Sequence, residues 1–196
     1  SCTDLTPALA RVLGVSIAPL KIKVGDAVQH VDDGSLDTVQ LIREMKACRT
    51  SPTTACPSPD EYAARMRECE ACFVITLSSK LSGSYNAACV ARDMVLEDEP
   101  GKKIAVLDSE SAAAGQTLIA LTLRRLIDAR SARSPETLMT TFQQAETGFI
   151  EALVSIYEPA CLPFFEKARA RSLRQLNLVI PEGLQSRVAY TKAEAL

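Results

Sequence analysis

Three serines and one glycine whose chemistry suits an anion site lie in one short segment: Ser79, Ser82, Gly83 and Ser84. The segment follows residues 72–77, an almost continuously apolar run that predicts a strand covered on both faces. In an open α/β sheet, ligands bind beyond the carboxyl ends of the strands. Hydroxyl groups and the free N–H groups of a first helical turn attract an anion, and glycine lets it approach the backbone. The segment therefore predicts a site for a carboxylate or a phosphate.

Two other roles suit the same serines. A helix N-cap role for Ser82 or Ser84 explains them equally well. A nucleophile in a small hydrolase or transferase is the alternative role for Ser82 or Ser79. The sequence has no G-x-S-x-G elbow, and its only histidine, His30, lies in a segment that reads as a polar loop. No catalytic residue is therefore assigned, and the enzyme stays the alternative hypothesis.

The cysteines predict neither a metal site nor a disulfide framework. There are seven, an odd number, and Cys69 and Cys72 are the only close pair. A zinc site would need a second such pair, and Cys48 and Cys56 have no recognised ligand spacing. A thioredoxin-type pair would open a helix, whereas this one lies where a predicted helix passes into a strand. We expect reduced, mostly buried thiols and no cofactor.

Composition and charge exclude several classes of function. The formal charge is −2 and the basic residues are spread along the chain, so a nucleic-acid partner is not expected. No apolar stretch approaches the ~20 residues of a membrane span, and residues 1–7 lack the features of a signal peptide. The phosphate loop and the dinucleotide-binding glycine pattern are missing from the sequence. We expect a cytoplasmic protein, either a ligand carrier or a pure interaction domain.

The elements that position the serine segment repeat a strand–turn–helix pattern, which predicts a three-layer α/β/α domain with a mostly parallel sheet. After the strand at 72–77 we expect a helix over 85–96, a strand over 104–107 and a helix over 113–129. Earlier predictions are a helix over 5–13, a strand over 15–24, a polar loop over 25–34, a helix over 36–48 capped by Ser35, and a helix from Ser58 to about Cys69. Later predictions are a helix from Ser134 beyond Ala145, a basic helix over 160–174 and a short strand over 176–180, with no firm signal over 185–196.

Five segments, in order, resemble the DegV family. The string ITLSSKLSGSYNAA, residues 75–88, resembles the LSS-x-LSG-[ST]-Y signature. The other four are residues 1–5 (DS-x-x-DL), 18–20 (VPL), 54–59 (TSQPSP) and 106–109 with Gly115 (VxDS-x(n)-G). Five ordered matches are far more specific than any one of them.

The resemblance implies two α/β domains that hold a long-chain fatty acid between them and no catalytic chemistry. The family's carboxylate contacts fall here on Thr54 and Ser82, with Ser79, Gly83 and Ser84 around them. Some members are lipid-binding subunits of fatty acid kinase, so a kinase catalytic subunit is an expected partner. The fatty acid itself would be the ligand.

Departures from the family pattern bear on the domain boundaries. Position 1 corresponds to a point just after the family's first strand, so we expect that strand to be missing. Ala55 and Cys56 replace the Ser and Gln of the TSQPS segment. Beyond about Ala145 the family's later motifs do not occur. We therefore expect a DegV-type domain over 1–145 and a truncated or divergent second-domain segment over 146–196.

Overall fold

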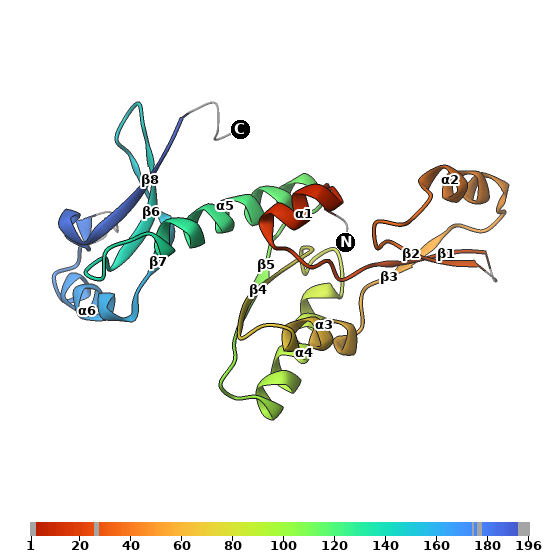
Figure 1. The fold of residues 1–196 in the computed structure, drawn as a ribbon, viewed down its shortest axis with the longest axis horizontal. Coiled ribbons are helices and arrows are strands. Elements are labelled where there is room, and N and C mark those ends of the chain that lie inside the picture. Colours follow the sequence, from red (N-terminus) through yellow and green to blue (C-terminus); the bar gives the residue numbers. More distant parts are fainter. Residues whose placement is uncertain (1–2, 26–27, 174, 176–177, 192–196) are drawn as a thin grey trace. The chain divides into compact units, whose positions relative to one another are not determined.

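The computed structural model describes residues 3–25, 28–173, 175 and 178–191. The chain divides into two compact units, Ser1–Ala120 and Leu121–Leu196. Helix α5 (Ala114–Ser131) passes from the first unit into the second (Figure 1).

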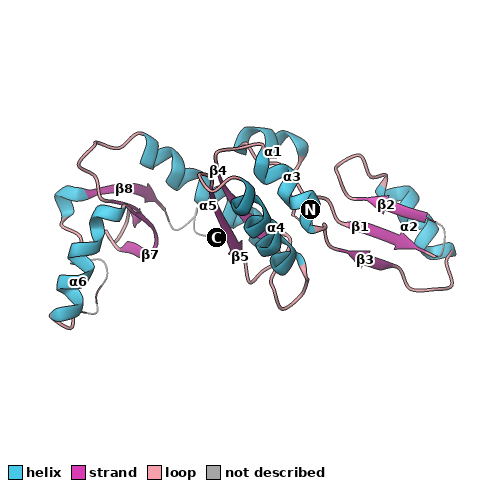
Figure 2. Ribbon diagram, turned by 90° about the horizontal axis from the view of Figure 1, so that it is seen from below, coloured by secondary structure: helices cyan, strands magenta, loops and turns pink. Residues whose placement is uncertain are grey.

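The first unit is built around two parallel strands, β4 (Ala71–Thr76) and β5 (Lys103–Asp108). They pair without a register shift, and helix α4 (Ser84–Asp98) connects them and lies across them (Figure 2). In such a pairing the carboxyl ends of both strands meet at one edge. The predicted strand–turn–helix repeat and the α/β class are confirmed.

Helices α3 (Pro59–Arg67) and α4 form the core of this unit with one face of the two strands. Ala63, Ala88 and Ala91 are completely buried between the helices. Small side chains at a helix contact let the helix axes approach closely. Met66 fills the remaining space, and burying a side chain of this size stabilises the fold by about 1.5–3 kcal/mol.

The predicted cap of α3 is confirmed. The Glu61 N–H donates to Ser58 Oγ at 3.3 Å, and the Ser58 N–H donates to Glu61 Oε2 at 2.7 Å, with Pro59 at the first helical position. The Lys21 ammonium also donates to Glu61 Oε2, at 2.9 Å. This bond, followed by the Ser58 N–H, holds the pKa of Glu61 below its usual range. The glutamate thus ties the start of α3 to Lys21, which lies 40 positions earlier in the chain.

A small antiparallel sheet precedes α3, in the order β2 (Val28–Val31), β1 (Lys21–Val24) and β3 (Thr53–Ala55). The strand predicted over 15–24 is therefore shorter than expected. The polar loop predicted over 25–34 is wrong, because Val28–Val31 pairs back on β1 after a turn at Gly25, whose φ is 66°. The polar residues of this segment suggested a loop, but its pairing with β1 makes it the second strand of a hairpin.

Helix α2 (Thr38–Ala47) packs on this sheet, where His30 Nε2 lies 2.6 Å from Glu44 Oε2. The helix confirms the prediction over 36–48, but the expected Ser35 cap is wrong. Asp37 caps α2 by accepting two backbone N–H groups. The Ser35 hydroxyl and N–H both donate to Asp33, so Ser35 belongs to the turn before the helix.

Helix α1 (Pro7–Leu13) confirms the first predicted helix. The Thr6 hydroxyl accepts the Leu9 N–H at 3.2 Å, which caps its start. It ends at Gly14, which has a left-handed φ of 65°.

The second unit contains a three-stranded sheet in the order β7, β6, β8. Its elements after α5 are β6 (Met139–Gln144), β7 (Ile150–Tyr157), the short helix η1 (Pro159–Cys161), α6 (Leu162–Ala170), the short helix η3 (Glu182–Leu184) and β8 (Gln185–Tyr190). Helix α6 confirms the helix predicted over 160–174. Strand β8 lies in the region 185–196, for which the sequence pattern makes no firm prediction. Of the predicted strand over 176–180, residues 176 and 177 lie outside the described residues, and 178–180 form a turn.

The helix predicted from Ser134 beyond Ala145 is wrong. Residues 139–142 are all buried, because β6 is the central strand and pairs with β7 and β8. The buried Thr140 and Thr141 suit a strand better than a helix. The proline and glutamate after Ser134 predicted a helix start, but the pairing of this segment with β7 and β8 makes it a strand.

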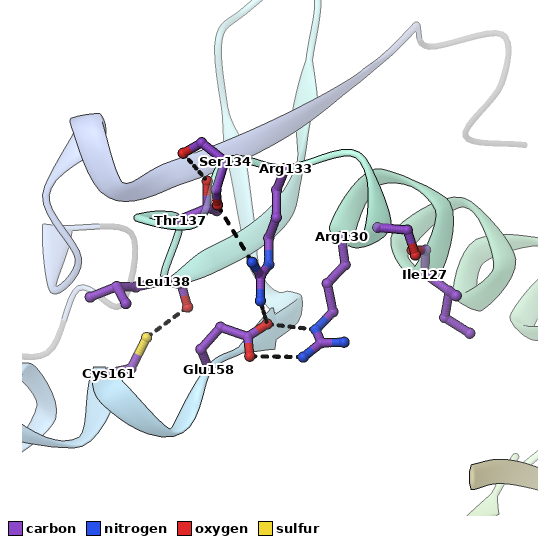
Figure 3. Close-up of polar contacts among 9 residues, drawn as sticks. Ile127, Arg130, Arg133, Ser134, Thr137, Leu138, Glu158 and Cys161 are labelled. Atoms are coloured by element: carbon purple, nitrogen blue, oxygen red, sulfur yellow. Dashed lines mark hydrogen bonds and ion pairs between the residues drawn. The ribbon is translucent and has the colours of Figure 1, made fainter. Parts of the chain in front are cut away.

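Glu158 anchors the residues between α5 and β6 (Figure 3). Arg130 binds its carboxylate through two N–H groups, one at 2.9 Å, and Arg133 binds it at 3.1 Å. Arg130, the strongest influence, holds the pKa of Glu158 below its usual range. Ser134 was expected to open a helix. Instead it begins a turn, in which its carbonyl oxygen accepts the Thr137 N–H at 3.1 Å.

We predict that Gly115→Ala destabilises the first unit. A Cβ at this position would lie 1.8 Å from Ser111 Oγ and 2.9 Å from Ser111 Cβ, so Ser111 would have to move. Overpacking of this kind costs about 1–3 kcal/mol. Chemical denaturation measures the loss, with Gly101→Ala as the control, because a Cβ at Gly101 meets nothing within 4 Å. Equal stability of the two variants would contradict the account of this loop.

We also predict that Cys72 resists alkylation in the folded protein. Burial, followed by the adjacent Cys69 thiol, raises the pKa of Cys72 from 9.0 to about 12. At pH 8 its thiolate fraction is then about a thousandfold smaller than that of an unshifted thiol. Iodoacetamide treatment with peptide mapping should modify Cys72 in urea and leave it unmodified without urea. Equal alkylation rates with and without urea would show that the Cys72 thiol is not buried and that its pKa is not raised.

Candidate functional site

The serine segment forms the turn between β4 and α4, at the carboxyl end of β4. Two hydrogen bonds attach it to the loop after β5. The Ser78 N–H donates to the Ser111 carbonyl at 2.9 Å, and the Ser79 N–H donates to Asp108 Oδ1 at 3.0 Å. The turn is therefore held by the neighbouring strand end as well as by its own chain.

Ser79 is exposed and has the Asp108 carboxylate as its neighbour. The Ser79 hydroxyl, followed by the Glu110 N–H, holds the pKa of Asp108 below its usual range. A carboxylate whose charged form is stabilised in this way is a weaker base than an unperturbed one. His30 is bound to Glu44 and makes no hydrogen bond to Ser79 or Ser82 in the described structure.

Ser82 and Ser84 are brought together at the start of α4. Their hydroxyl oxygens lie 2.9 Å apart, and the Ser84 N–H donates to Ser82 Oγ at 3.2 Å. Ser84 is only 2% exposed, whereas Ser82 is half-buried. The expected N-cap role of Ser82 or Ser84 is wrong, because Gly83 is the N-cap of α4 and no side chain caps this helix. The Ser82 oxygen accepts the Ser84 N–H, and its hydroxyl can still donate one proton to another acceptor.

Gly83 is exposed and directly precedes α4. Its φ of −68° is an ordinary value, so the backbone itself does not require glycine. A Cβ at Gly83 would lie 3.6 Å from the Cys56 sulfur, which is normal van der Waals contact. Cys56 therefore packs beside Gly83.

Thr54 lies on β3, opposite Ile22 of β1, and its side chain is exposed. The contact between Cys56 and the position of the Gly83 Cβ places the segment of Thr54 beside the serine turn. In the described structure no hydrogen bond joins Thr54 to Ser82. The segment of Thr54 therefore lies beside the serine turn, but the Thr54 and Ser82 hydroxyls are not hydrogen-bonded to each other.

Tyr62 is a site residue that the sequence analysis missed. It lies on α3, is 8% exposed, and belongs to the same buried cluster as Ala88 of α4. Burial raises the pKa of Tyr62, and the Ser84 hydroxyl opposes that rise. The helical spacing after the Ser58 cap could have predicted a core position for Tyr62. It could not have predicted which residues of another helix lie beside it.

Among the residues that the structure describes, no group of three or more metal-ligating His, Cys, Asp or Glu side chains occurs. The helices within the described ranges include none that is long and apolar enough to cross a membrane. What the serine turn offers is a set of hydroxyl donors at the N-terminus of a 15-residue helix. Such a helix end favours negative charge.

Solved structures with this fold come from proteins with similar sequences. A DegV-family protein of Ruminococcus gnavus, refined with vaccenic acid, superposes with a TM-score of 0.60 at 34% identity over 68% of this chain and 47% of that one. The fatty acid kinase B3 protein of Streptococcus pneumoniae, loaded with linoleic acid, gives a TM-score of 0.56 at 40% identity over 60% of this chain and 41% of that one.

Sequence comparison points to the same group. A DegV domain-containing protein of Streptococcus pneumoniae is 42% identical over 123 residues, which cover 63% of this chain and 43% of the relative. The chain thus spans less than half the length of these relatives. A family model described as "Uncharacterised protein, DegV family" matches residues 1–150. Over three quarters of its length, therefore, the chain belongs to the DegV family.

Proposed function

We propose that this chain binds a long-chain fatty acid and has no catalytic activity of its own. Its carboxylate would accept hydrogen bonds from Ser82 and Thr54, with Ser79, Gly83 and Ser84 around it, and its tail would occupy a buried tunnel. The fatty acids carried by the solved relatives support this ligand class. The kinase B3 relative supports a further role in presenting the acid to a fatty acid kinase catalytic subunit.

The observation that carries the proposal is the arrangement around Ser82. Its oxygen accepts the Ser84 N–H, and its half-buried hydroxyl lies at a helix N-terminus. A hydroxyl in that position suits an acceptor-only anion, and the other amides of the first turn have no acceptor within the helix. A hydrogen bond to a charged partner is about twice as strong as a neutral one.

Affinity would come chiefly from the tail. At ~0.8 kcal/mol per buried CH₂, roughly 14 methylenes contribute about 11 kcal/mol before the costs of association. The carboxylate site then sets the orientation of the ligand and distinguishes an acid from a neutral lipid.

We predict that the purified chain retains a fatty acid of about 14 to 18 carbons, because burial of that tail offsets the cost of ordering it. Native mass spectrometry followed by denaturing extraction measures the amount bound. Extraction that recovers no stoichiometric lipid would contradict the carrier proposal for this chain. Labelling of Ser79 or Ser82 by a fluorophosphonate probe would favour the hydrolase alternative instead.

We predict that Ser82→Ala weakens fatty-acid binding by about 1.5–3 kcal/mol, or roughly 10- to 150-fold. Loss of the acceptor for the Ser84 N–H should also lower stability by about 1 kcal/mol, the worth of an ordinary hydrogen bond. Thr54→Val is the matched variant, because it removes an exposed hydroxyl that caps no helix, so binding should weaken while stability is kept. Titration with a fatty acid and with the matching alcohol is the measurement. Equal binding of acid and alcohol by the wild type would show that no carboxylate site exists here.

A further inference from the structure

The strand that carries Thr54 has no buried side chain to hold it in place. Strand β3 consists of three exposed residues and forms one edge of the small sheet (Figure 2). Its register against β1 places Thr54 opposite Ile22 and Ala55 opposite Lys21. Because Thr53 is also a threonine, a slip of one residue could put Thr53 opposite Ile22 without changing the side-chain type, and it would turn Thr54 to the other face of the sheet. The register is therefore not fixed by the side chains of β3.

Lys21 connects the two ends of the segment that follows this strand. Its backbone pairs with Ala55 in the ladder between β1 and β3, and its ammonium donates to Glu61 Oε2 at 2.9 Å. The same carboxylate oxygen accepts the Ser58 N–H at 2.7 Å, at the start of α3. Only residues 56–57 lie between Ala55 and Ser58. The segment is thus held on one side by the ladder and on the other by the cap of α3, and Lys21 takes part in both.

Helix α3 is the fixed part of this arrangement. Three of its residues are buried in the core that it shares with α4, and Pro57 is fully buried just before the cap residue. The bond from Lys21 to Glu61 sets the position of β1 along the start of this helix. A slip of one residue moves paired strands by about 3.4 Å. Such a slip would break the 2.9 Å bond unless the lysine changed its rotamer.

We propose that Lys21 is a positioning residue that fixes the register of β3 and thereby keeps Thr54 beside the serine turn. Lys21 would not touch the ligand and would act only through Thr54. The inference rests on the proposed function, since it requires the Thr54 hydroxyl to donate to the carboxylate. It assigns the placing of that donor to an ion pair between two other elements, β1 and α3.

Lys21→Met tests the proposal, because it removes the ammonium and keeps an unbranched side chain. The side chains of Lys21 and Glu61 are 30% and 33% exposed, so loss of the pair should change the stability of the fold little. We expect affinity for a fatty acid to fall about two- to fivefold, the usual worth of an exposed ion pair, and the preference for the acid over the matching alcohol to fall with it. Lys21→Arg, which keeps a charged donor, should restore both.

The matched control is Lys23→Met, which makes the same change two residues further along β1. Lys23 is exposed and makes no ion pair with any residue that the structure describes. This variant should bind the acid and the alcohol as the wild type does.

Glu61→Gln separates positioning from direct attraction of the ligand by the ammonium. Glutamine can keep the cap of α3, because a capping box accepts either residue, but it removes the charge that holds Lys21. If Lys21 acts by positioning, affinity for the acid should fall as it does in Lys21→Met. If the ammonium attracts the carboxylate directly, its release from Glu61 would raise the affinity, and the proposal would be wrong.

A double-mutant cycle with Thr54→Val shows whether the effect passes through Thr54. Lys21→Met combined with Thr54→Val should lose no more affinity than Thr54→Val alone, because Lys21 then has no donor to position. Additive losses would overturn the proposal. Hydrogen exchange at residues 53–55 reports on the ladder without any ligand. It should be faster in Lys21→Met than in the wild type and in Lys23→Met, and equal exchange in all three would also overturn the proposal.

The outcomes separate this inference from the proposed function. A wild type that prefers the acid, a Thr54→Val variant with weakened binding and a Lys21→Met variant with unchanged binding would overturn the role of Lys21 and leave the carboxylate site intact. A wild type without any preference for the acid would overturn both. Affinity for the acid that falls in Lys21→Met and Glu61→Gln, is restored in Lys21→Arg and is unchanged in Lys23→Met supports the inference.

Discussion

The parallel, in-register pairing of β4 and β5 is the constraint on which the candidate site depends. It sets Thr76 opposite Asp108, so the turn that follows each strand leaves the sheet at the same edge. The Asp108 carboxylate can then accept the Ser79 N–H, and the Ser111 carbonyl can accept the Ser78 N–H. A shift of the register by one residue would separate these partners and reverse the faces of the strand. The serine turn is thus a product of sheet geometry.

Packing of α3 on α4 adds the second requirement. Alanines at the contact bring the two helices close together, and Tyr62 of α3 lies in the same buried cluster as Ala88 of α4. The same arrangement puts Cys56, just before α3, beside Gly83. A core contact and an exposed hydroxyl site are therefore parts of one structure, so changes that leave the surface untouched can alter the site.

Local signals predicted the parts of this fold that depend on neighbouring residues. The cap at Ser58 is complete within four residues, and the β4 strand is apolar enough to be recognised alone. Long-range pairing decided the rest. The helix expected after Ser134 is a central strand, because β7 and β8 supply its partners. The serine turn was predicted from its position after a strand. The packing of Tyr62 beside α4 was not, because it depends on how two helices meet, which a local sequence pattern does not specify.

The central claim is that hydroxyl donors at the start of α4 hold an ionised carboxylate. Hydrogen bonds to the charged form lower a carboxyl pKa, whereas burial in an apolar pocket raises it. A fatty acid labelled with ¹³C at its carboxyl carbon reports this directly, through the pH dependence of its NMR shift in the complex with this chain. The account predicts that the bound carboxyl titrates below the pKa of a short carboxylic acid in water. A bound carboxyl that titrates above that value would contradict it.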